Sequence, residues 1–86
     1  MKKEQFKYLP NDEVNIGNGV KVLLIDKEPV RVKNPYSGDS CVLEPVAVAI
    51  HDFIKGCEMT GNYDKMSYAL DVFSQNWASE YMVLLD

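Results

Sequence analysis

Residues 43–57, LEPVAVAIHDFIKGC, constrain the fold more than any other stretch of the chain. Glu44 and Pro45 predict a helix start, because proline suits the first helical position and an acid faces the positive end of the dipole. Apolar residues then recur every three or four positions along one helix face, namely Val46, Ala49, Ile50, Phe53, Ile54 and Cys57. Burying each large side chain there stabilises the fold by roughly 1.5–3 kcal/mol. We therefore expect the rest of the chain to pack around this helix.

The residues before this helix have the character of β-strands. Residues 20–25, VKVLLI, contain β-branched residues and are largely apolar, and residues 29–32, PVRV, form a second candidate strand with proline at its first position. Val14 and Ile16 precede an Asn-Gly turn and allow a further short strand. The sequence predicts an antiparallel meander of two or three strands over residues 14–33, which needs helices to cover its apolar face.

Two more helices are expected after the main one. Asn62 can cap a helix from Tyr63 to about Ser74, and Asn76 can cap a short last helix. The predicted fold is α+β, with an N-terminal antiparallel meander followed by three short helices packed on one face. With 86 residues the chain forms a single domain, 1–86. Within it, 1–13 is either an arm or a partly ordered terminus, 34–42 is a loop and 43–86 is the helical part.

The charge is unevenly distributed along the chain. Residues 1–33 hold seven Lys and Arg against five acids, whereas residues 34–86 hold two Lys against eight acids. The acidic second half argues against general nucleic-acid binding, because it repels phosphate backbones. No apolar run is long enough for a signal peptide or a membrane span. With two cysteines and no disulfide framework, a cytoplasmic location is expected.

Candidate catalytic and metal-binding residues are few. A zinc site needs about four nitrogen or sulfur ligands, and the chain offers only Cys41, His51 and Cys57. We expect His51 on the solvent side of the main helix near Lys55. A nucleophilic enzyme would have to use Cys41 with His51, and no motif supports that pairing. The sequence therefore predicts no catalytic residues, no metal and no cofactor.

A ligand site is predicted where the second strand leads into the following loop. Arg31 and Lys33 supply cations, Tyr36 can stack on a ligand, and Gly38 lets backbone N–H groups approach it. Together with the loop residues these give a candidate anion-binding set of Arg31, Lys33, Asn34, Tyr36, Ser37 and Gly38. The alternative is an ordinary strand-to-helix connection with exposed charges.

The aromatic residues of the last third suggest a partner surface. Spacing assigns most of them to the core, but tyrosine and tryptophan are also frequent at interfaces. Residues that the core could leave to a partner are Tyr68, Trp77, Tyr81 and Met82. Small chains often gain additional burial by self-association, so a homo-oligomer is expected as well.

Three segments resemble small uncharacterised proteins encoded in phage and prophage genomes. They are NPYSG (residues 34–38), DFIKGCE (residues 52–58) and EYMVLLD (residues 80–86). The resemblance implies an accessory factor that binds a host protein or defence system without turnover. The leading interpretation is therefore a non-catalytic binding protein, and the alternative is an oligomer that sequesters a small anionic ligand such as a signalling nucleotide.

Overall fold

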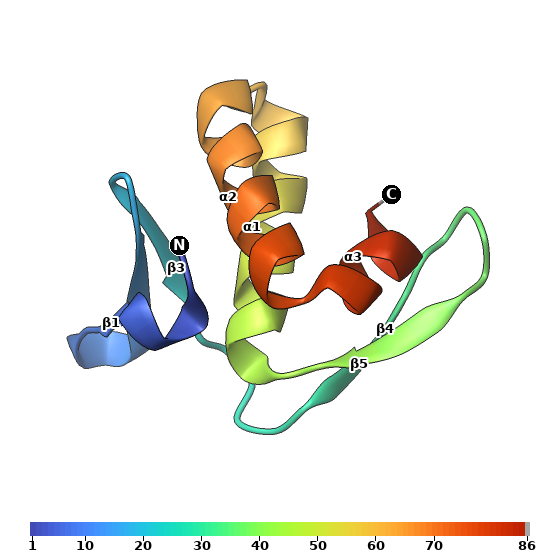
Figure 1. Ribbon diagram of the computed structural model, residues 1–86, viewed down its shortest axis with the longest axis horizontal. Helices are drawn as coiled ribbons and strands as arrows, with labels where there is room; N and C mark the ends of the chain where they lie inside the picture. Colours follow the sequence, from blue (N-terminus) through green and yellow to red (C-terminus); the bar gives the residue numbers. More distant parts are fainter. Residues whose placement is uncertain (86) are drawn as a thin grey trace.

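The computed structural model describes residues 1–85 and arranges them in three layers (Figure 1). The middle layer is a pair of helices, α1 (Pro45–Thr60) and α2 (Tyr63–Asn76). A three-stranded sheet covers one side of this pair, and a short helix with a β-hairpin lies on the other. Asp86, the last residue of the predicted helical part, lies outside the described residues.

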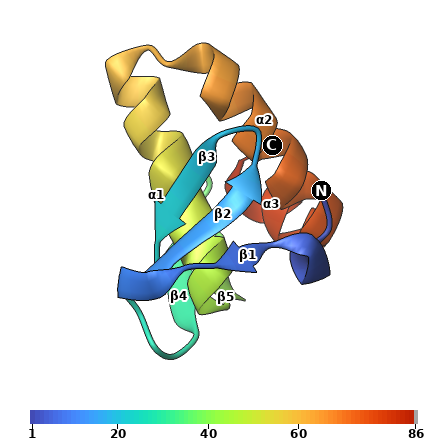
Figure 2. The same cartoon turned by 90° about the vertical axis from the view of Figure 1, so that its left-hand side faces the viewer.

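The three-stranded sheet, called sheet A, is an antiparallel meander. Its strands in spatial order are β1 (Lys7–Tyr8), β2 (Glu13–Gly17) and β3 (Val20–Leu23). Alternate side chains of β2 and β3 are buried, and the others face away from the helices. Figure 2 shows the sheet lying across the helix pair, so its apolar face is covered as a small sheet requires.

The second sheet is a separate hairpin of β4 (Val30–Lys33) and β5 (Ser40–Leu43). The sequence prediction placed residues 29–32 in the meander and residues 34–42 in a loop, and both assignments differ from the structure. The reason is local, because the Asn34 N–H donates to the Asp39 carbonyl at 2.7 Å and closes the loop as a hairpin turn. The chain therefore reverses and pairs β4 with β5.

Helix α1 begins where the sequence indicates, and of the two glycines that could end it, Gly56 and Gly61, the second does so. Pro45 is its first residue, and Gly61 ends it in the left-handed conformation with φ of 78°. Its predicted apolar face is buried except for Phe53, which is half-buried. The third helix, α3 (Ala78–Leu84), follows α2 after a single residue. The predicted α+β class, with an antiparallel meander and three helices, is confirmed.

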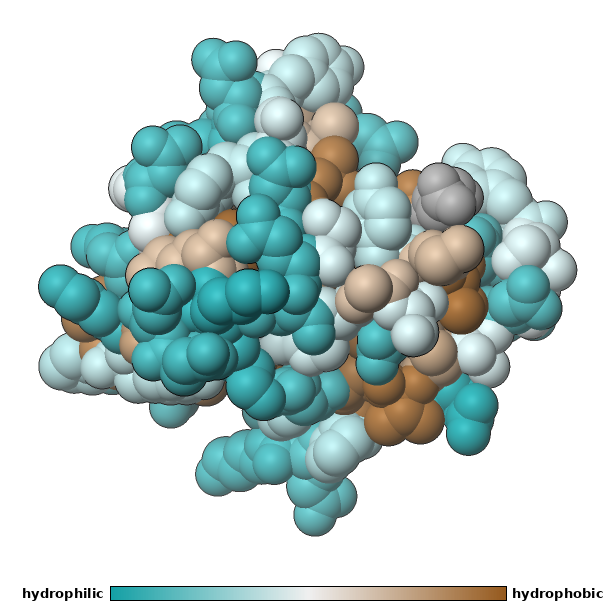
Figure 3. All heavy atoms as spheres, viewed as in Figure 1, coloured by the Kyte–Doolittle hydropathy of each residue, from teal (hydrophilic) through white to brown (hydrophobic). Residues whose placement is uncertain are grey.

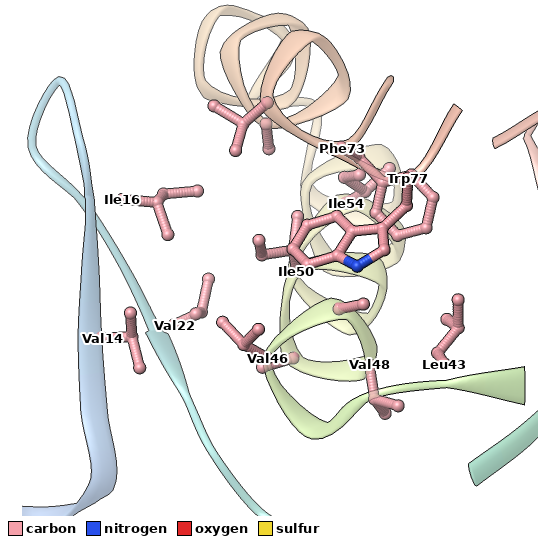
Figure 4. Close-up of a cluster of buried hydrophobic side chains, with 14 of the residues drawn as sticks. Val14, Ile16, Val22, Leu43, Val46, Val48, Ile50, Ile54, Phe73 and Trp77 are labelled. Atoms are coloured by element: carbon pink, nitrogen blue, oxygen red, sulfur yellow. The ribbon is translucent and has the colours of Figure 1, made fainter. Parts of the chain in front are cut away.

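The hydrophobic core lies between sheet A and the helix pair. Figure 4 shows Val14, Ile16 and Val22 pointing from the sheet toward Val46 and Ile50 of α1. At the other end of the core, aromatic rings of α2 and its C-cap pack together. The centroid of the Phe73 ring lies 5.5 Å from that of the Trp77 ring.

The N-terminal residues lie against the body of the protein. The sequence analysis left two alternatives for residues 1–13, an arm or a partly ordered terminus. In this segment β1 lies between two 3-10 helices, η1 (Lys3–Gln5) and η2 (Pro10–Asp12). Phe6 is buried, and its ring centroid lies 6.5 Å from that of Trp77. The Asn76 side chain donates to the Met1 carbonyl at 2.8 Å and so links this segment to the end of α2.

Glu44 ties three parts of the chain together at the start of α1. Its carboxylate accepts hydrogen bonds from the Lys3 ammonium at 3.1 Å and from the Trp77 indole N–H at 3.1 Å. The acid also lies at the positive end of the α1 dipole.

Among residues 1–85, no helix combines the length and apolar character needed to cross a bilayer.

Candidate functional site

A groove of about 570 Å³ opens between the helix pair and the turn of the β4–β5 hairpin. Its apolar floor is formed by Ile54, Met66, Leu70, Leu84 and Leu85. In the space-filling view, hydrophobic atoms reach the surface between the helices and the hairpin (Figure 3). Ligand pockets are typically lined in this way, mostly apolar with a few polar groups around them, and this volume lies within their usual range.

The groove exists because α3 is too short to cover the helix pair completely. Sheet A packs on one face of the helix pair, mainly through β3 on α1, whereas the seven residues of α3 cover only part of the other face (Figure 1). On α1, residues 51, 54, 55 and 58 recur at helical spacing and line the groove. On α2, residues 63, 66 and 70 do the same.

Charged and aromatic side chains form the rim of the groove. Lys33 and Tyr36 lie on the hairpin side, and Lys55 and Tyr63 lie on the helix side. The Lys55 ammonium is 3.8 Å from the carboxylate of Glu58, one turn further along α1. This pair is solvent-exposed and therefore contributes little to stability. The rim thus carries both signs of charge.

Tyr36 projects from the rim while its backbone is held in place. The residue is 93% exposed, the highest value for any large hydrophobic residue between 1 and 85. The Asn34 side-chain oxygen accepts hydrogen bonds from the Tyr36 N–H at 2.8 Å and the Ser37 N–H at 3.4 Å. The Asn34 side-chain amide donates to the Val83 carbonyl at 3.0 Å and fixes the loop to α3.

His51 lies in the wall of the groove with its side chain only 12% exposed. Its ring centroid is 6.4 Å from that of Phe73. The expectation that His51 faces solvent is therefore wrong, although Lys55 does lie close to it. Burial lowers the pKa of the His51 imidazole, Lys55 lowers it further and Asp52 partly raises it. The neutral imidazole is consequently favoured inside the groove.

The predicted ligand set is divided by the structure. Lys33, Asn34 and Tyr36 line the groove, whereas Arg31, Ser37 and Gly38 do not. The Arg31 guanidinium donates to the Ser40 hydroxyl at 3.2 Å across the outer face of the hairpin. Asn34 uses its side-chain amide within the protein. The loop therefore contributes a cation and an aromatic ring to the groove, and its arginine lies elsewhere.

The four residues suggested for a partner interface do not share one exposed surface. Trp77 is buried, and Tyr81 is half-buried against the core. The Tyr68 hydroxyl donates to the Ile16 carbonyl at 2.7 Å, which joins α2 to sheet A. Only Met82 is largely exposed.

Cys41 and His51, the pair that a nucleophilic enzyme would have to use, lie in different parts of the structure. Cys41 packs against the core from β5, and burial with the nearby Glu80 raises the pKa of its thiol while Arg31 lowers it. Cys41 does not line the groove that contains His51. Within residues 1–85, no three His, Cys, Asp or Glu side chains gather as metal ligands would.

Sequence reasoning missed most of the groove lining. His51 was expected on the solvent side of the main helix near Lys55, and Met66 and Leu70 were not among the predicted site residues. One signal was available, since residues 46–50 form an uninterrupted apolar run that must be covered on more than one side.

Comparisons with protein-family models, with curated proteins and with solved structures gave no match.

Proposed function

We propose that this chain is a non-catalytic binding protein whose groove receives an apolar segment of another protein. The observation that carries the proposal is an apolar floor bordered by two exposed tyrosines, Tyr36 and Tyr63. Tyrosine gives a large contact area with few rotatable bonds and is enriched among the residues that dominate binding energy. The floor residues Met66, Leu70 and Leu85 are only half-buried, so an incoming side chain would remove them from water.

The resemblance to phage-encoded proteins suggests what kind of partner this is. We propose a phage accessory factor that occupies a host protein or a component of host defence and thereby modulates or inhibits it. Such a role needs affinity and a suitable surface but no reaction centre. A small chain that presents an apolar groove meets both requirements.

A capture experiment with matched variants tests this function. Wild type, Met66→Glu and Met59→Glu would be immobilised and exposed to lysate of a bacterial host. Met66 lies in the groove floor, whereas Met59 is exposed on α1 outside the groove, so both variants add one carboxylate to the helix pair. We expect the same host protein to be retained by wild type and Met59→Glu and lost with Met66→Glu. Retention by all three variants would contradict a role for the groove.

A second candidate is an oligomer that sequesters a small anionic ligand such as a signalling nucleotide. It is favoured by one observation, namely that Lys33 and Tyr36 border the same groove as Lys55. Two cations with a stacking ring suit a phosphate-bearing aromatic ligand. Arg31 lies outside the groove, so Arg31→Ala is the matched control for Lys33→Ala. A nucleotide that raises the melting temperature of wild type and Arg31→Ala but not of Lys33→Ala would favour this candidate.

A further inference from the structure

The β4–β5 hairpin has one strand edge without a strand beside it. Within residues 1–85, β4 pairs with β5 on one side and with no strand on the other. Strand β5 packs on α3, whereas β4 packs mainly on β5. The edge of a sheet presents unpaired N–H and C=O groups, with which another chain can pair. The outer edge of β4 is therefore a place where a further strand can be added.

The register of the hairpin shows which backbone groups point outward from β4. The Asn34 N–H donates to the Asp39 carbonyl, so these two residues form a hydrogen-bonded pair. Such pairs alternate with non-hydrogen-bonded pairs along an antiparallel ladder. Counting back along β4, Val32 is bonded to β5, whereas the backbone groups of Lys33 and Arg31 point away from it. The outer edge thus offers two N–H donors and two C=O acceptors.

Two prolines limit the length of this edge. Pro29 directly precedes β4, and Pro35 lies two positions after its last residue. Proline has no N–H and cannot donate to an added strand. Pairing is therefore confined to the backbone of Arg31 and Lys33, which suits a short strand of about five residues.

The side chains next to these backbone groups are both cationic. Arg31 and Lys33 are exposed on the same face of β4, and neither forms an ion pair with a carboxylate of residues 1–85. Two copies of the chain that paired through β4 would place cation against cation, and like charges directly opposite are destabilising in a sheet. Acidic side chains at the opposite positions would be favourable. The charge of this edge therefore selects an acidic segment and disfavours a second copy.

The other face of β4 is apolar. Val30 and Val32 are half-buried and pack against the core. Successive side chains of a strand point to opposite faces, so every second side chain of an added strand would lie beside these valines. An apolar side chain there would remove further apolar surface from water. The sequence that fits β4 consequently alternates acidic and apolar residues.

The outer strands of sheet A lack this combination. Strand β1 has only two residues, and β3 carries a single cation, Lys21. The exposed face of β3 also includes Leu23, which has no charge to pair with an acid. Among the strand edges of residues 1–85, that of β4 has the strongest charge preference.

We propose that β4 binds an extended acidic segment of a partner protein, which adds to the hairpin as a third, antiparallel strand. Acidic side chains of the segment lie opposite Arg31 and Lys33, and its apolar side chains lie beside Val30 and Val32. In this arrangement the N–H groups of the acidic residues donate to β4, and those of the apolar residues point away. The surface is separate from the groove except at Lys33, so the inference does not depend on the proposed function.

NMR titration with short peptides tests this strand addition. The probe is a five-residue peptide that alternates valine with glutamate and has valine at both ends. We expect it to shift the amide signals of Arg31 and Lys33, whereas the same peptide with lysine in place of glutamate should not bind. N-methylation of the two glutamate N–H groups should weaken binding by about 10-fold or more, because it removes donors to β4. N-methylation of the inner valine is the matched control and should change the affinity by less than about 2-fold.

Variants at Arg31, which does not line the groove, separate charge from backbone pairing. Arg31→Gln removes the charge and keeps the N–H, and it should weaken binding by about 5-fold. Arg31→Pro also removes the outward N–H and should weaken binding by about a further 10-fold. The control Lys21→Gln, which removes an exposed cation from sheet A, should bind like wild type.

Three results would overturn the proposal. They are no shift of the β4 amides up to about 5 mM of the glutamate peptide, equal effects of N-methylation at glutamate and at valine, and equal binding by Arg31→Gln and Arg31→Pro. Circular dichroism verifies that the variants are folded. If Arg31→Pro unfolds, the methylated peptides decide the question with the wild-type protein.

Discussion

The two faces of the α1–α2 pair are covered to different extents. On one face, sheet A contacts the helices directly, and Val14, Ile16 and Val20 are at most 1% exposed. On the other face, the β4–β5 hairpin packs on α3, and Leu43 is its one fully buried side chain. Met66 and Leu70 on that face stay half-buried at the groove.

The difference separates stability from recognition within one small domain. Both faces meet a small antiparallel sheet, but in different ways. β3 of sheet A packs directly on α1, whereas the hairpin reaches α1 only through β5 and packs mainly on α3. On that side α3, with only seven residues, lies between most of the hairpin and the helix pair. We therefore expect substitutions on the sheet A side to change the free energy of unfolding most, and substitutions on the groove side to change binding most.

The largest effect should come from a deletion in the closed core. Phe73→Ala should lower the free energy of unfolding by about 3–5 kcal/mol, because the ring is fully buried and leaves a cavity. Leu70→Ala, on the same helix but at the groove, should lower it by about 1 kcal/mol. Urea denaturation followed by circular dichroism measures both. Equal losses would show that the two faces are equally well packed.

Gly17→Ala should be the next most damaging change. Gly17 has φ of 100°, and an added Cβ would overlap the Tyr68 hydroxyl that bonds to the Ile16 carbonyl. Backbone strain and the lost hydrogen bond together should lower the free energy of unfolding by about 2–4 kcal/mol. Gly19→Ala is the control, since Gly19 also has positive φ but open space around it, and it should cost about 1–2 kcal/mol. If both variants lose the same amount, the contact between Tyr68 and sheet A is unimportant.

Asn34→Ala should have a smaller effect that is confined to the open side. It removes the hydrogen bond to Val83 and those to the loop amides, which we expect to lower the free energy of unfolding by about 1–2 kcal/mol. Hydrogen exchange at the Tyr36 amide should accelerate, while exchange in sheet A stays slow. Ser37→Ala, which loses one bond to the Asp39 N–H, is the milder control. Unchanged exchange at Tyr36 would mean that Asn34 does not hold the loop.

The smallest effect is a pH dependence from His51. Its pKa is lowered in the folded protein, so the unfolded chain binds more protons as the pH falls below about 6.5. The stabilisation is fully present above that pH and is lost progressively until the pH reaches the folded pKa. Wild type should therefore lose stability between pH 7.5 and 5.5 in urea denaturation, and His51→Gln should lose less. Identical profiles would show that His51 is solvated like a surface residue.

Much of the fold can be predicted from the sequence because it depends on local patterns. The spacing of Val46, Ile50 and Ile54 identifies the buried face of α1, and Pro45 marks its start. The pairing of β4 with β5 was missed, because it depends on how Asn34 closes its loop. Local rules describe NPYSG equally well as a connection or as a hairpin turn.

The candidate site was harder to predict than the fold. Met66 and Leu70 belong to the same residue types as the buried core, and periodicity shows which face of a helix is apolar but not how far a neighbour covers it. Lys33 and Tyr36 were identified from the composition of their loop. Arg31 shares a face of β4 with Lys33, yet only the end of the strand reaches the groove. The spacing of residues in the sequence does not show which part of the strand borders the groove.

The bond between Trp77 and Glu44 has a practical consequence. Trp77 is the single indole of the chain, and it lies where Phe6, the first residue before α1 and the end of α2 come together. Its fluorescence emission should therefore report the docking of the N-terminal segment with no added label. Release of that segment would expose the indole to water and shift the emission to longer wavelength. The protein therefore contains its own optical probe of whether the N-terminal segment is docked.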